Sequence, residues 1–519
     1  MKPLTIPFIL AGFFASISSS HAEVTLSKIF GDHMVLQQGQ PIRIFGTASP
    51  GEKIQASLAG KTATTKAGEN GYFRVELPAM EADGKTHTLT VSGENTVTLE
   101  DILLGEVWLC SGQSNMEWSV AASMDAQKEI ARAKHPNIRL FNVPGHIASK
   151  APLDDPRGTW QVCSPQTISG FSAVGYYFGR ALQKELDVPI GLVGTNWGGT
   201  RIEPWTPPVG FRQVPELEDY NANLDSFDPS SDKGKANLES YLQKMESWLA
   251  GAKGDVAAGK VFQDPPTFNL QPLAGATTIY NGMVHGLVPL SVKGAIWYQG
   301  ESNAGDGLRY EYMKEALVKG WRSVFENEGL SFYWVQLANF QNPTVNPEGG
   351  GWGPVREGQR RALRLPKTGM AVTIDIGEAR DIHPRNKQDV GARLALWALA
   401  KDYGKKIVYS GPLYKSMAIE GEKIRIHFDH VGGGLITAKK EGLDLAEETD
   451  GDELTNFAIQ EYNGSWYWAK AKIEGDTVVV QARGVSKPKH VRFGYQSNPE
   501  GINLYNFDGL PASPFTTEE

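Results

Sequence analysis

Between residues 105 and 404, short apolar runs alternate with segments of helical periodicity, and this alternation restricts the fold more than any other feature of the sequence. The runs cover residues 106–110, 138–143, 190–195, 294–298, 332–337 and 370–375. Apolar positions recur at helical spacing over residues 172–187, 310–325 and 387–403. Buried strands that alternate with amphipathic helices predict an α/β domain, a parallel sheet with helices on both faces.

The segments on either side have a different pattern of apolar and polar residues. Residues 23–104 alternate apolar and polar positions in short runs separated by turn residues, which predicts a small N-terminal β-sandwich-like domain. The same alternation returns over residues 405–519 and predicts a second β-sandwich-like domain at the C-terminus. Within the α/β domain, the Pro-rich and acidic stretch at about 206–277 interrupts the rhythm and predicts an insertion with one helix near 238–249.

The first 22 residues have the features of a secretory signal peptide. Lys2 precedes an apolar run from Ile6 to Ile17, and Ser20-His21-Ala22 offers small residues for cleavage. We expect a mature chain that begins near Glu23 and is exported, to a periplasm or outside the cell; the alternative is an uncleaved anchor. No later apolar segment reaches the length of a membrane span.

The charge and the cysteine count exclude some kinds of partner and metal site. A formal charge of −8 and a pI near 5.8 provide no basic footprint for nucleic acid. The chain has only two cysteines, which excludes a Cys-based zinc site. Because export exposes thiols to oxidising conditions, we predict a disulfide between Cys110 and Cys163, with two buried free thiols as the alternative.

Polar, Gly-containing loops follow four of the predicted strands, where an open parallel sheet places its functional residues. Ser114 follows the first strand by one tight turn at Gly112, which makes it the best nucleophile candidate. Among the histidines, only His383 lies in a loop after a core strand with an aspartate, Asp381, two residues before it. Ser114, His383 and Asp381 are therefore the predicted catalytic triad.

Two parts of this prediction stay open. Asp375 and Glu378 are alternative residues to orient His383. Donors for an oxyanion could come from the backbone N–H groups of Ser114 and Gly199 and from the side-chain amide of Gln299 or Asn303, although the glycine loop could simply permit close packing.

These loops resemble the sialate O-acetylesterase family of carbohydrate esterases, within the SGNH-hydrolase superfamily. The resemblance rests on five blocks and extends upstream to residues 33–37: CSGQSNM at 110–116, WGGTRIEPW at 197–205, YNGM at 280–283, WYQGESNA at 297–304 and DIHPRNK at 381–387. Many superfamily members have aspartate three residues before the histidine, a position that Arg380 occupies here.

The resemblance implies an SGNH-type, flavodoxin-like sheet and a serine esterase that needs no metal or other cofactor and removes acetyl groups from a glycan through an acetyl-enzyme. Its substrate would be O-acetylated sialic acid or, alternatively, an acetylated plant glycan such as xylan or xyloglucan. Arg201 could pair with a sialate carboxylate or form a salt bridge with Glu203 or Glu301. Trp118 and Trp197 could stack on sugar rings or belong to the core.

Two rival classes remain. A non-catalytic glycan-binding protein would not need Ser114, His383 and Asp381 together. A metalloenzyme could use the His427-Phe428-Asp429-His430 segment, which has no third cluster of ligands near it in the sequence.

Overall fold

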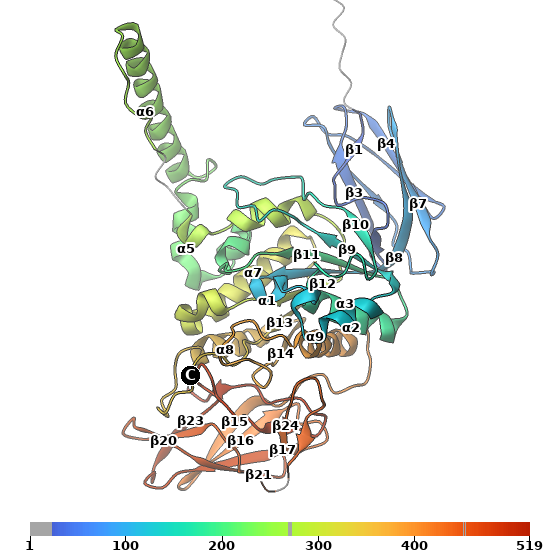
Figure 1. Ribbon diagram of the computed structural model, residues 1–519. Helices are drawn as coiled ribbons and strands as arrows, with labels where there is room; N and C mark the ends of the chain where they lie inside the picture. The colour runs from blue at the N-terminus through green and yellow to red at the C-terminus, as the bar shows by residue number, and fades with distance from the viewer. Residues whose placement is uncertain (1–22, 268–271, 450, 452, 519) are drawn as a thin grey trace, which may run out of the picture.

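A computed structural model describes residues 23–267, 272–449, 451 and 453–518. The predicted signal peptide lies outside these residues. Figure 1 shows three β-containing regions in a row: an N-terminal sandwich, a central α/β region and a C-terminal β region. The predicted fold class is confirmed by this arrangement.

The centre of the molecule is the predicted parallel sheet. Its strands lie in the order β10-β9-β11-β8-β12-β13-β14, and all neighbours are parallel except β10 with β9. The strands are β8 (Thr96–Gly112), β9 (His135–Asn142), β10 (Trp160–Cys163), β11 (Ile190–Asn196), β12 (Gly294–Tyr298), β13 (Ser331–Val335) and β14 (Thr368–Ala371). All six predicted core runs form strands here.

The predicted helices cover this sheet in two layers. Helix α3 (Ala173–Leu186) packs against α9 (Lys387–Lys401), and α7 (Tyr310–Val324) packs against α4 (Pro208–Arg212) and α8 (Gly353–Arg361). Each buries its apolar stripe: in α7 this includes Met313, Leu317 and Trp321. Short α1 (Ser114–Glu117) and α2 (Ala126–Arg132) follow β8.

Strand β8 belongs to two regions at once. Its first half pairs antiparallel with β7 (His87–Ser92) and its middle pairs with β2 (Val35–Gln37). Its last seven residues pair with β11, and the last five of these also pair with β12. Its burial follows the same division, from alternating in the sandwich to continuous in the central sheet. The expected boundary at 104 therefore falls inside one unbroken strand.

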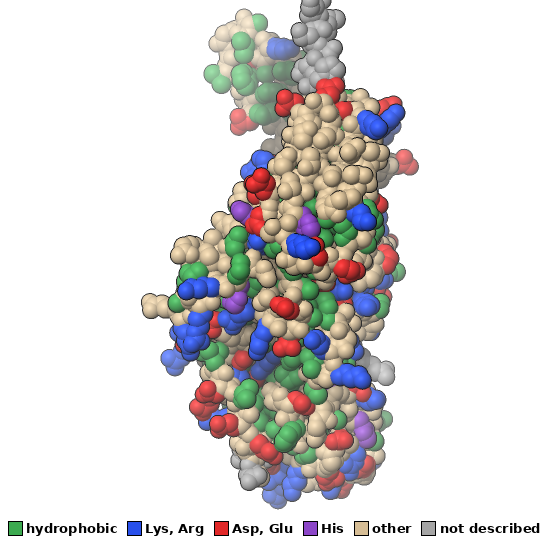
Figure 2. All heavy atoms as spheres, turned by 90° about the vertical axis from the view of Figure 1, so that its right-hand side faces the viewer, with side chains coloured by type: hydrophobic (Ala, Val, Ile, Leu, Met, Phe, Trp, Pro, Cys, Tyr) green, Lys and Arg blue, Asp and Glu red, His purple; other side chains and the backbone are tan. Residues whose placement is uncertain are grey.

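The N-terminal sandwich is made of two antiparallel layers. One contains β1 (Thr25–Leu26), β3 (Ile42–Thr47) and β6 (Tyr72–Leu77), and the other contains β4 (Lys53–Leu58), β5 (Lys61–Lys66), β7 and β8. Figure 2 shows this region near the top with mostly uncharged polar side chains and backbone, above a body where acidic and basic side chains are interspersed. The Thr-rich β5 contributes exposed positions to it.

The stretch at 206–277 carries α4, α5 (Glu218–Asp225) and α6 (Asp232–Ala257). The single expected helix near 238–249 is thus only the middle of α6, which projects from the body in Figure 1. No helix within the described ranges combines the length and the apolar character that a bilayer crossing needs.

The C-terminal region is made of three small antiparallel sheets, ordered β15-β16-β22-β21, β18-β17-β24 and β20-β19-β23-β25. Their strands are β15 (Leu413–Glu420), β16 (Lys423–Asp429), β17 (Leu435–Lys439), β18 (Glu447–Glu448), β19 (Phe457–Glu461), β20 (Trp466–Trp468), β21 (Lys470–Glu474), β22 (Thr477–Gln481), β23 (Pro488–Phe493), β24 (Leu504–Asn506) and β25 (Phe515–Thr516).

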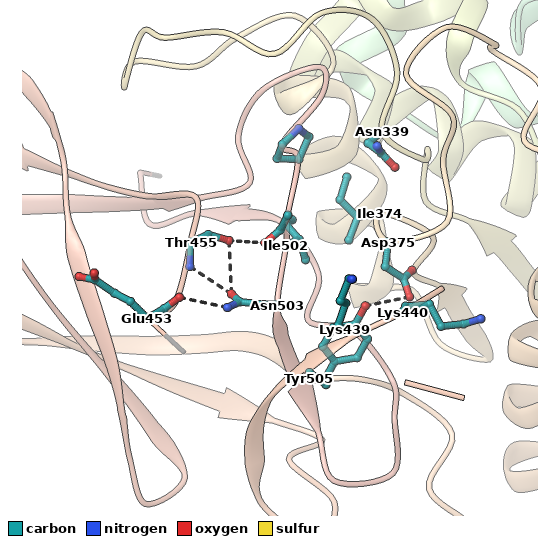
Figure 3. Close-up of a pocket in the computed structure, with 13 residues that line it drawn as sticks. Asn339, Ile374, Asp375, Lys439, Lys440, Glu453, Thr455, Ile502, Asn503 and Tyr505 are labelled. Carbon is teal, nitrogen blue, oxygen red and sulfur yellow. Dashed lines mark hydrogen bonds between the residues drawn. The ribbon is translucent and has the colours of Figure 1, made fainter. Parts of the chain in front are cut away.

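A cavity of about 440 Å³ lies between the C-terminal and central regions. Figure 3 shows its lining, in which Tyr505 donates a hydrogen bond to Asp375 at 3.2 Å. Fully buried Arg356 also joins the two regions, because its guanidinium donates to the carbonyls of Gln496 and Ser497.

Candidate active site

The end of β8 places Ser114 at the carboxyl edge of the parallel sheet. Gly112 pairs with Tyr298 of β12 and with Asn196 of β11, so the loops after all three strands meet here. A Cβ on Gly112 would lie 2.2 Å from the carbonyl oxygen of Tyr298, and its φ is +142°, so only glycine fits. The chain then turns into α1, whose first residue is Ser114.

Ser114 and His383 are in direct contact, although 268 residues separate them in the chain. The Oγ of Ser114 lies 2.8 Å from Nε2 of His383. This is the distance expected between a nucleophile and its general base. The contact is the central geometric feature of the site.

Asp381 contacts the other side of the imidazole. Its Oδ1 lies 3.5 Å from Nδ1 of His383 and accepts a hydrogen bond from the backbone N–H of His383 at 2.9 Å. The Asp381 side chain is 48% exposed, against 26% for His383. The Asp381 carboxylate is therefore near the imidazole but loosely coupled to it.

The two alternative acids have other partners. Buried Asp375 forms a bidentate ion pair with Arg393 of α9, at 2.6 and 2.7 Å. Glu378 accepts hydrogen bonds from the backbone and side chain of Arg385 at 3.0 and 3.2 Å. Of the three acids considered, Asp381 is the one whose carboxylate contacts His383.

Burial lowers the pKa of His383 below its ordinary 6.5, and the nearby charge of Lys387 adds to this, while Asp381 opposes it. The imidazole is consequently neutral at neutral pH. A neutral imidazole can accept the proton of the Ser114 hydroxyl, as a general base must.

The indole of Trp118 stacks on the His383 ring, with centroids 4.8 Å apart and planes inclined by 15°. Trp197 stacks in the same manner on His146, at 5.2 Å and 5°. His146 in turn contacts Glu117 at 2.7 Å, and Glu117 accepts a hydrogen bond from the N–H of Gly198 at 2.6 Å. Trp118 and Trp197 thus both lie at the site, each with one face against a histidine.

Glu117 and His146 were missed by the sequence analysis. His146 lies in the loop after β9, which was not among the four strand-end loops in which catalytic groups were sought. The position of Glu117, three residues after Ser114 on the same short helix, was the available signal.

The predicted side-chain donors for the oxyanion, Gln299 and Asn303, require a correction. Both are fully buried. The Gln299 amide donates to Gln113, Asn303 and the carbonyl of Thr200, and the Asn303 amide donates to Glu203 and Asp306. Their N–H groups are therefore used within the protein and are not directed at a substrate on Ser114.

The glycine loop is better placed. A Cβ on Gly198 would lie 3.3 Å from Cβ of Ser114, so this loop runs directly beside the serine. The next residue, Gly199, is exposed and has a φ of +73°. Close passage of the backbone beside a nucleophile suits an oxyanion-binding N–H group.

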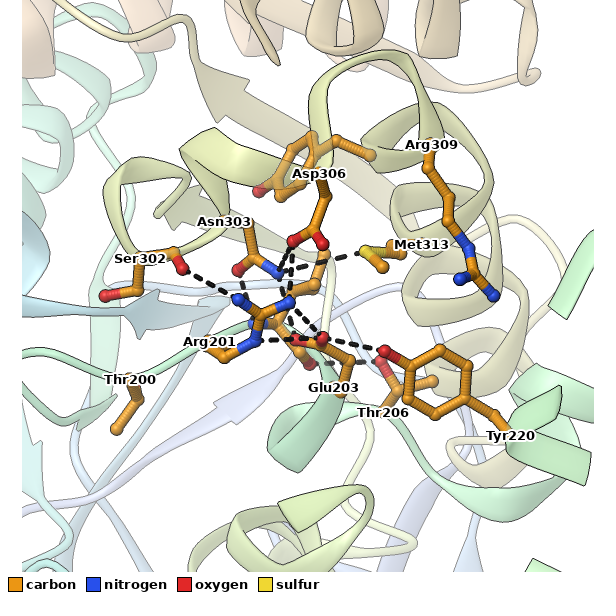
Figure 4. A network of polar contacts seen from close by, with 12 residues as sticks. Thr200, Arg201, Glu203, Thr206, Tyr220, Ser302, Asn303, Asp306, Arg309 and Met313 are labelled. Carbon is orange, nitrogen blue, oxygen red and sulfur yellow. Dashed lines mark hydrogen bonds and ion pairs between the residues drawn. The ribbon is translucent and has the colours of Figure 1, made fainter. Parts of the chain in front are cut away.

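Arg201 is held by internal partners (Figure 4). Its guanidinium contacts Glu203 at 2.7 Å and Asp306 at 2.6 Å, and donates to the carbonyl of Ser302 at 3.0 Å. Glu203 is fully buried and also accepts a hydrogen bond from Tyr220 at 2.9 Å. Of the two roles considered for Arg201, the structure shows the salt bridge with Glu203.

The predicted disulfide is wrong: Cys110 and Cys163 are free, buried thiols. They lie on β8 and β10, and strands β9 and β11 separate these two strands. At about 4.8 Å per strand the separation is roughly 14 Å, whereas bridged Cα atoms lie within about 7 Å. Burial raises the pKa of Cys163 to about 12 and that of Cys110 further, so both thiols are unreactive.

Within the described residues, no group of three or more His, Cys, Asp or Glu side chains is arranged to hold a metal ion. His430, from the segment considered for metal binding, packs against the rings of Trp397 and Tyr409.

The parallel sheet brings a serine and a histidine together at its carboxyl edge, where an open α/β sheet places its functional residues. Comparisons with known proteins identify the family. Residues 104–261 match the family model described as carbohydrate esterase, sialic acid-specific acetylesterase.

Two groups of relatives cover most of the chain. The sialate O-acetylesterase of Rattus norvegicus is 31% identical over 446 residues, which span 77% of this chain and 78% of the relative; that of Homo sapiens is 27% identical, over 81% and 78%. A crystal structure of a carbohydrate acetylesterase from Xanthomonas citri is 35% identical, with a TM-score of 0.77, and covers 95% of this chain and 99% of that one. The chain belongs to the sialate O-acetylesterase family and is a carbohydrate esterase.

Proposed function

We propose that this protein removes O-acetyl groups from a carbohydrate by serine catalysis, with Ser114 as nucleophile, His383 as general base and acid, and Asp381 as the acid that orients His383. The 2.8 Å contact between Ser114 Oγ and His383 Nε2 carries the proposal. The family assignment supports the reaction class, and the lowered pKa of His383 supports its role as a base.

The reaction has two halves. Ser114 Oγ attacks the acetyl carbonyl carbon while its proton passes to His383 Nε2, and the sugar oxygen then leaves with that proton. Water attacks the acetyl-enzyme with His383 again as base, and acetate is released. The backbone N–H groups of Ser114 and Gly199 are the proposed donors to the oxyanion in both halves.

O-acetylated sialic acid is the first candidate substrate, because the curated relatives are sialate O-acetylesterases. One observation favours a second candidate, a neutral acetylated glycan such as xylan or xyloglucan. Arg201, the cation expected to bind the sialate carboxylate, is already paired with two carboxylates. An uncharged sugar does not require that arginine.

The test is acetate release by the full chain and by Ser114→Ala from O-acetylated sialic acid and from acetylated xylan, side by side. Release from either substrate that disappears in the variant supports serine catalysis and identifies the substrate class. Release that survives in Ser114→Ala contradicts the proposal. Binding of both glycans without release by either protein would instead favour the non-catalytic glycan-binding alternative.

We also propose that the chain is exported, on the basis of the signal-like N-terminus. N-terminal sequencing of the protein recovered from outside the cytoplasm should begin near Glu23. An intact N-terminus in the cytoplasmic fraction would contradict this.

A further inference from the structure

Three polar side chains behind the Ser114–His383 pair have no part in the mechanism above. They are Asn115 on α1, Lys387 at the start of α9, and Glu301 in the 3-10 helix Glu301–Arg309. Lys387 is fully buried and Asn115 is 1% exposed. Burying an ammonium group costs free energy unless it is compensated, so this group needs an explanation.

Asn115 joins the other two. Its Nδ2 donates to Glu301 Oε1 at 2.6 Å and to the carbonyl oxygen of Ile382 at 2.9 Å, and its Oδ1 accepts from the Lys387 ammonium. The ammonium can only donate and the carbonyl of Ile382 can only accept, so these two contacts fix the orientation of the amide. The amide is therefore polarised between a cation and an anion, and it holds the residue that precedes His383.

Glu301 has a second, unused oxygen. Its Oε2 is inaccessible to solvent and has no hydrogen-bond partner. A buried carboxylate oxygen without a donor is costly unless a nearby positive charge stabilises it. Lys387, one amide group away, is the cation that can do so.

The Lys387 ammonium also lies beside the aromatic groups at the site. It is 5.9 Å from the ring centre of Trp118, the indole that stacks on His383, and 5.2 Å from that of Tyr298. Besides Lys387, the groups that act on His383 are Ser114 from α1 and Asp381 from its own loop. The carboxylates of Glu301, Glu378 and Asp381 act on Lys387.

We propose that Lys387, Asn115 and Glu301 form a positioning relay, in which Asn115 holds the His383 loop, Lys387 places a positive charge near the imidazole, and Glu301 helps to keep Lys387 charged. The inference rests on the proposed role of His383.

The relay has an electrostatic consequence with a defined sign. A cation near an imidazole disfavours its protonation, and Lys387 contributes in this direction to the lowered pKa of His383. Burial lowers the pKa of Lys387 itself to about 7, so the relay is sensitive to the loss of either charge.

The test measures the pKa of His383 directly, by NMR titration of the full chain labelled at its histidine rings, with His383→Asn to assign the signal. Lys387→Met should raise this pKa by about one unit, because it removes the cation. Glu301→Gln should also raise it, but by less, because loss of the anion that helps to keep Lys387 charged lets more of the ammonium deprotonate. The double variant should match Lys387→Met, because Glu301 acts on His383 through Lys387.

Lys415→Met is the matched control, since it removes an exposed lysine that pairs with Asp429 in the C-terminal region, and it should leave the pKa unchanged. Additive shifts in the double variant, or no shift in either single variant, would overturn the relay. If Lys387→Met does not fold, Glu301→Gln, which keeps the shape of the side chain, decides by itself whether the pKa rises.

The acidic limb of the pH profile of kcat/KM should move with the NMR value in each variant. Because the NMR titration does not depend on turnover, its result stands even if no substrate is found. If the variants leave the His383 pKa unchanged while acetate release persists, the relay is wrong and the proposed function stands. If no acetate is released, the proposed function fails and the NMR result on the relay still holds.

Discussion

Two charged clusters lie next to each other at the carboxyl edge of the sheet, and they differ in how completely their hydrogen-bonding capacity is used. In the cluster around Arg201, the cation contacts two carboxylates and a carbonyl, and one of these carboxylates also accepts a hydrogen bond from a tyrosine hydroxyl (Figure 4). In the cluster around His383, the acid is 3.5 Å from the ring and half exposed, and the imidazole contacts the hydroxyl of Ser114.

The difference separates a structural cluster from a chemical one. Groups that are fully hydrogen-bonded stabilise the loops that carry them and have little left for a ligand. Groups with unused hydrogen-bonding capacity are available to transfer a proton. The blocks WGGTRIEPW and WYQGESNA supply most of the first cluster, and the blocks around Ser114 and His383 supply the second.

The largest effect should come from Ser114→Ala, which removes the only proposed nucleophile. Acetate release should fall by at least about 10,000-fold, as when a triad serine is lost. Initial rates at saturating substrate measure this, and Ser416→Ala on β15 serves as the control that should keep full activity. A loss of less than tenfold would mean that Ser114 is not the nucleophile.

Asp381→Asn should cost less, about 100-fold in kcat with little change in KM, because the acid is exposed and loosely coupled to His383. Steady-state kinetics measure this. The companion variant Glu378→Gln should lose much less, since Glu378 contacts Arg385. The reverse order would identify Glu378 as the orienting acid.

Arg201→Met should act on stability. Removal of the arginine leaves buried Glu203 and Asp306 without a cation, and the free energy of unfolding should fall by about 2 kcal/mol, less than for a fully buried pair because the guanidinium is partly exposed. Denaturant unfolding measures this, with Arg309→Met, a partly exposed neighbour that pairs with Asp219, as control. A rise in KM confined to O-acetylated sialic acid, with stability unchanged, would instead assign Arg201 to the substrate.

The pH dependence of activity should follow the protonation of His383. His383 must be neutral to accept a proton, and its pKa lies below 6.5, so the acidic limb of kcat/KM should have its midpoint below pH 6.5. Activity is then retained down to that midpoint and lost as the pH falls through it. A midpoint above 6.5 would show that Asp381 outweighs burial and Lys387.

The smallest effect concerns the cysteines, where no change is expected. Both thiols should titrate in the denatured, unreduced protein, and a reducing agent should not alter the thermal midpoint. A count of zero thiols would contradict the separation of β8 and β10 in the sheet.

Much of this could be predicted from the sequence because its signals are local. The six strand runs and the three helices are periodic, and Ser114 and His383 follow strands whose ends must meet at one edge. The pairing of Cys110 with Cys163 could not be predicted, because strand order is a property of the whole sheet. The donors assigned to Gln299 and Asn303 failed for a related reason: whether an amide is free depends on neighbours such as Glu203, which lies about 100 residues away.

Strand β8 limits how this protein can be divided. Since one unbroken strand completes the N-terminal sandwich and then carries the backbone to Ser114, the two regions share hydrogen bonds along the same piece of chain. An exchange of the first 104 residues for those of a distant relative would change the register of the strand that ends at the nucleophile. Recombination should therefore tolerate junctions after α9 more readily than junctions before Ser114, and the sandwich and the sheet should be inherited together.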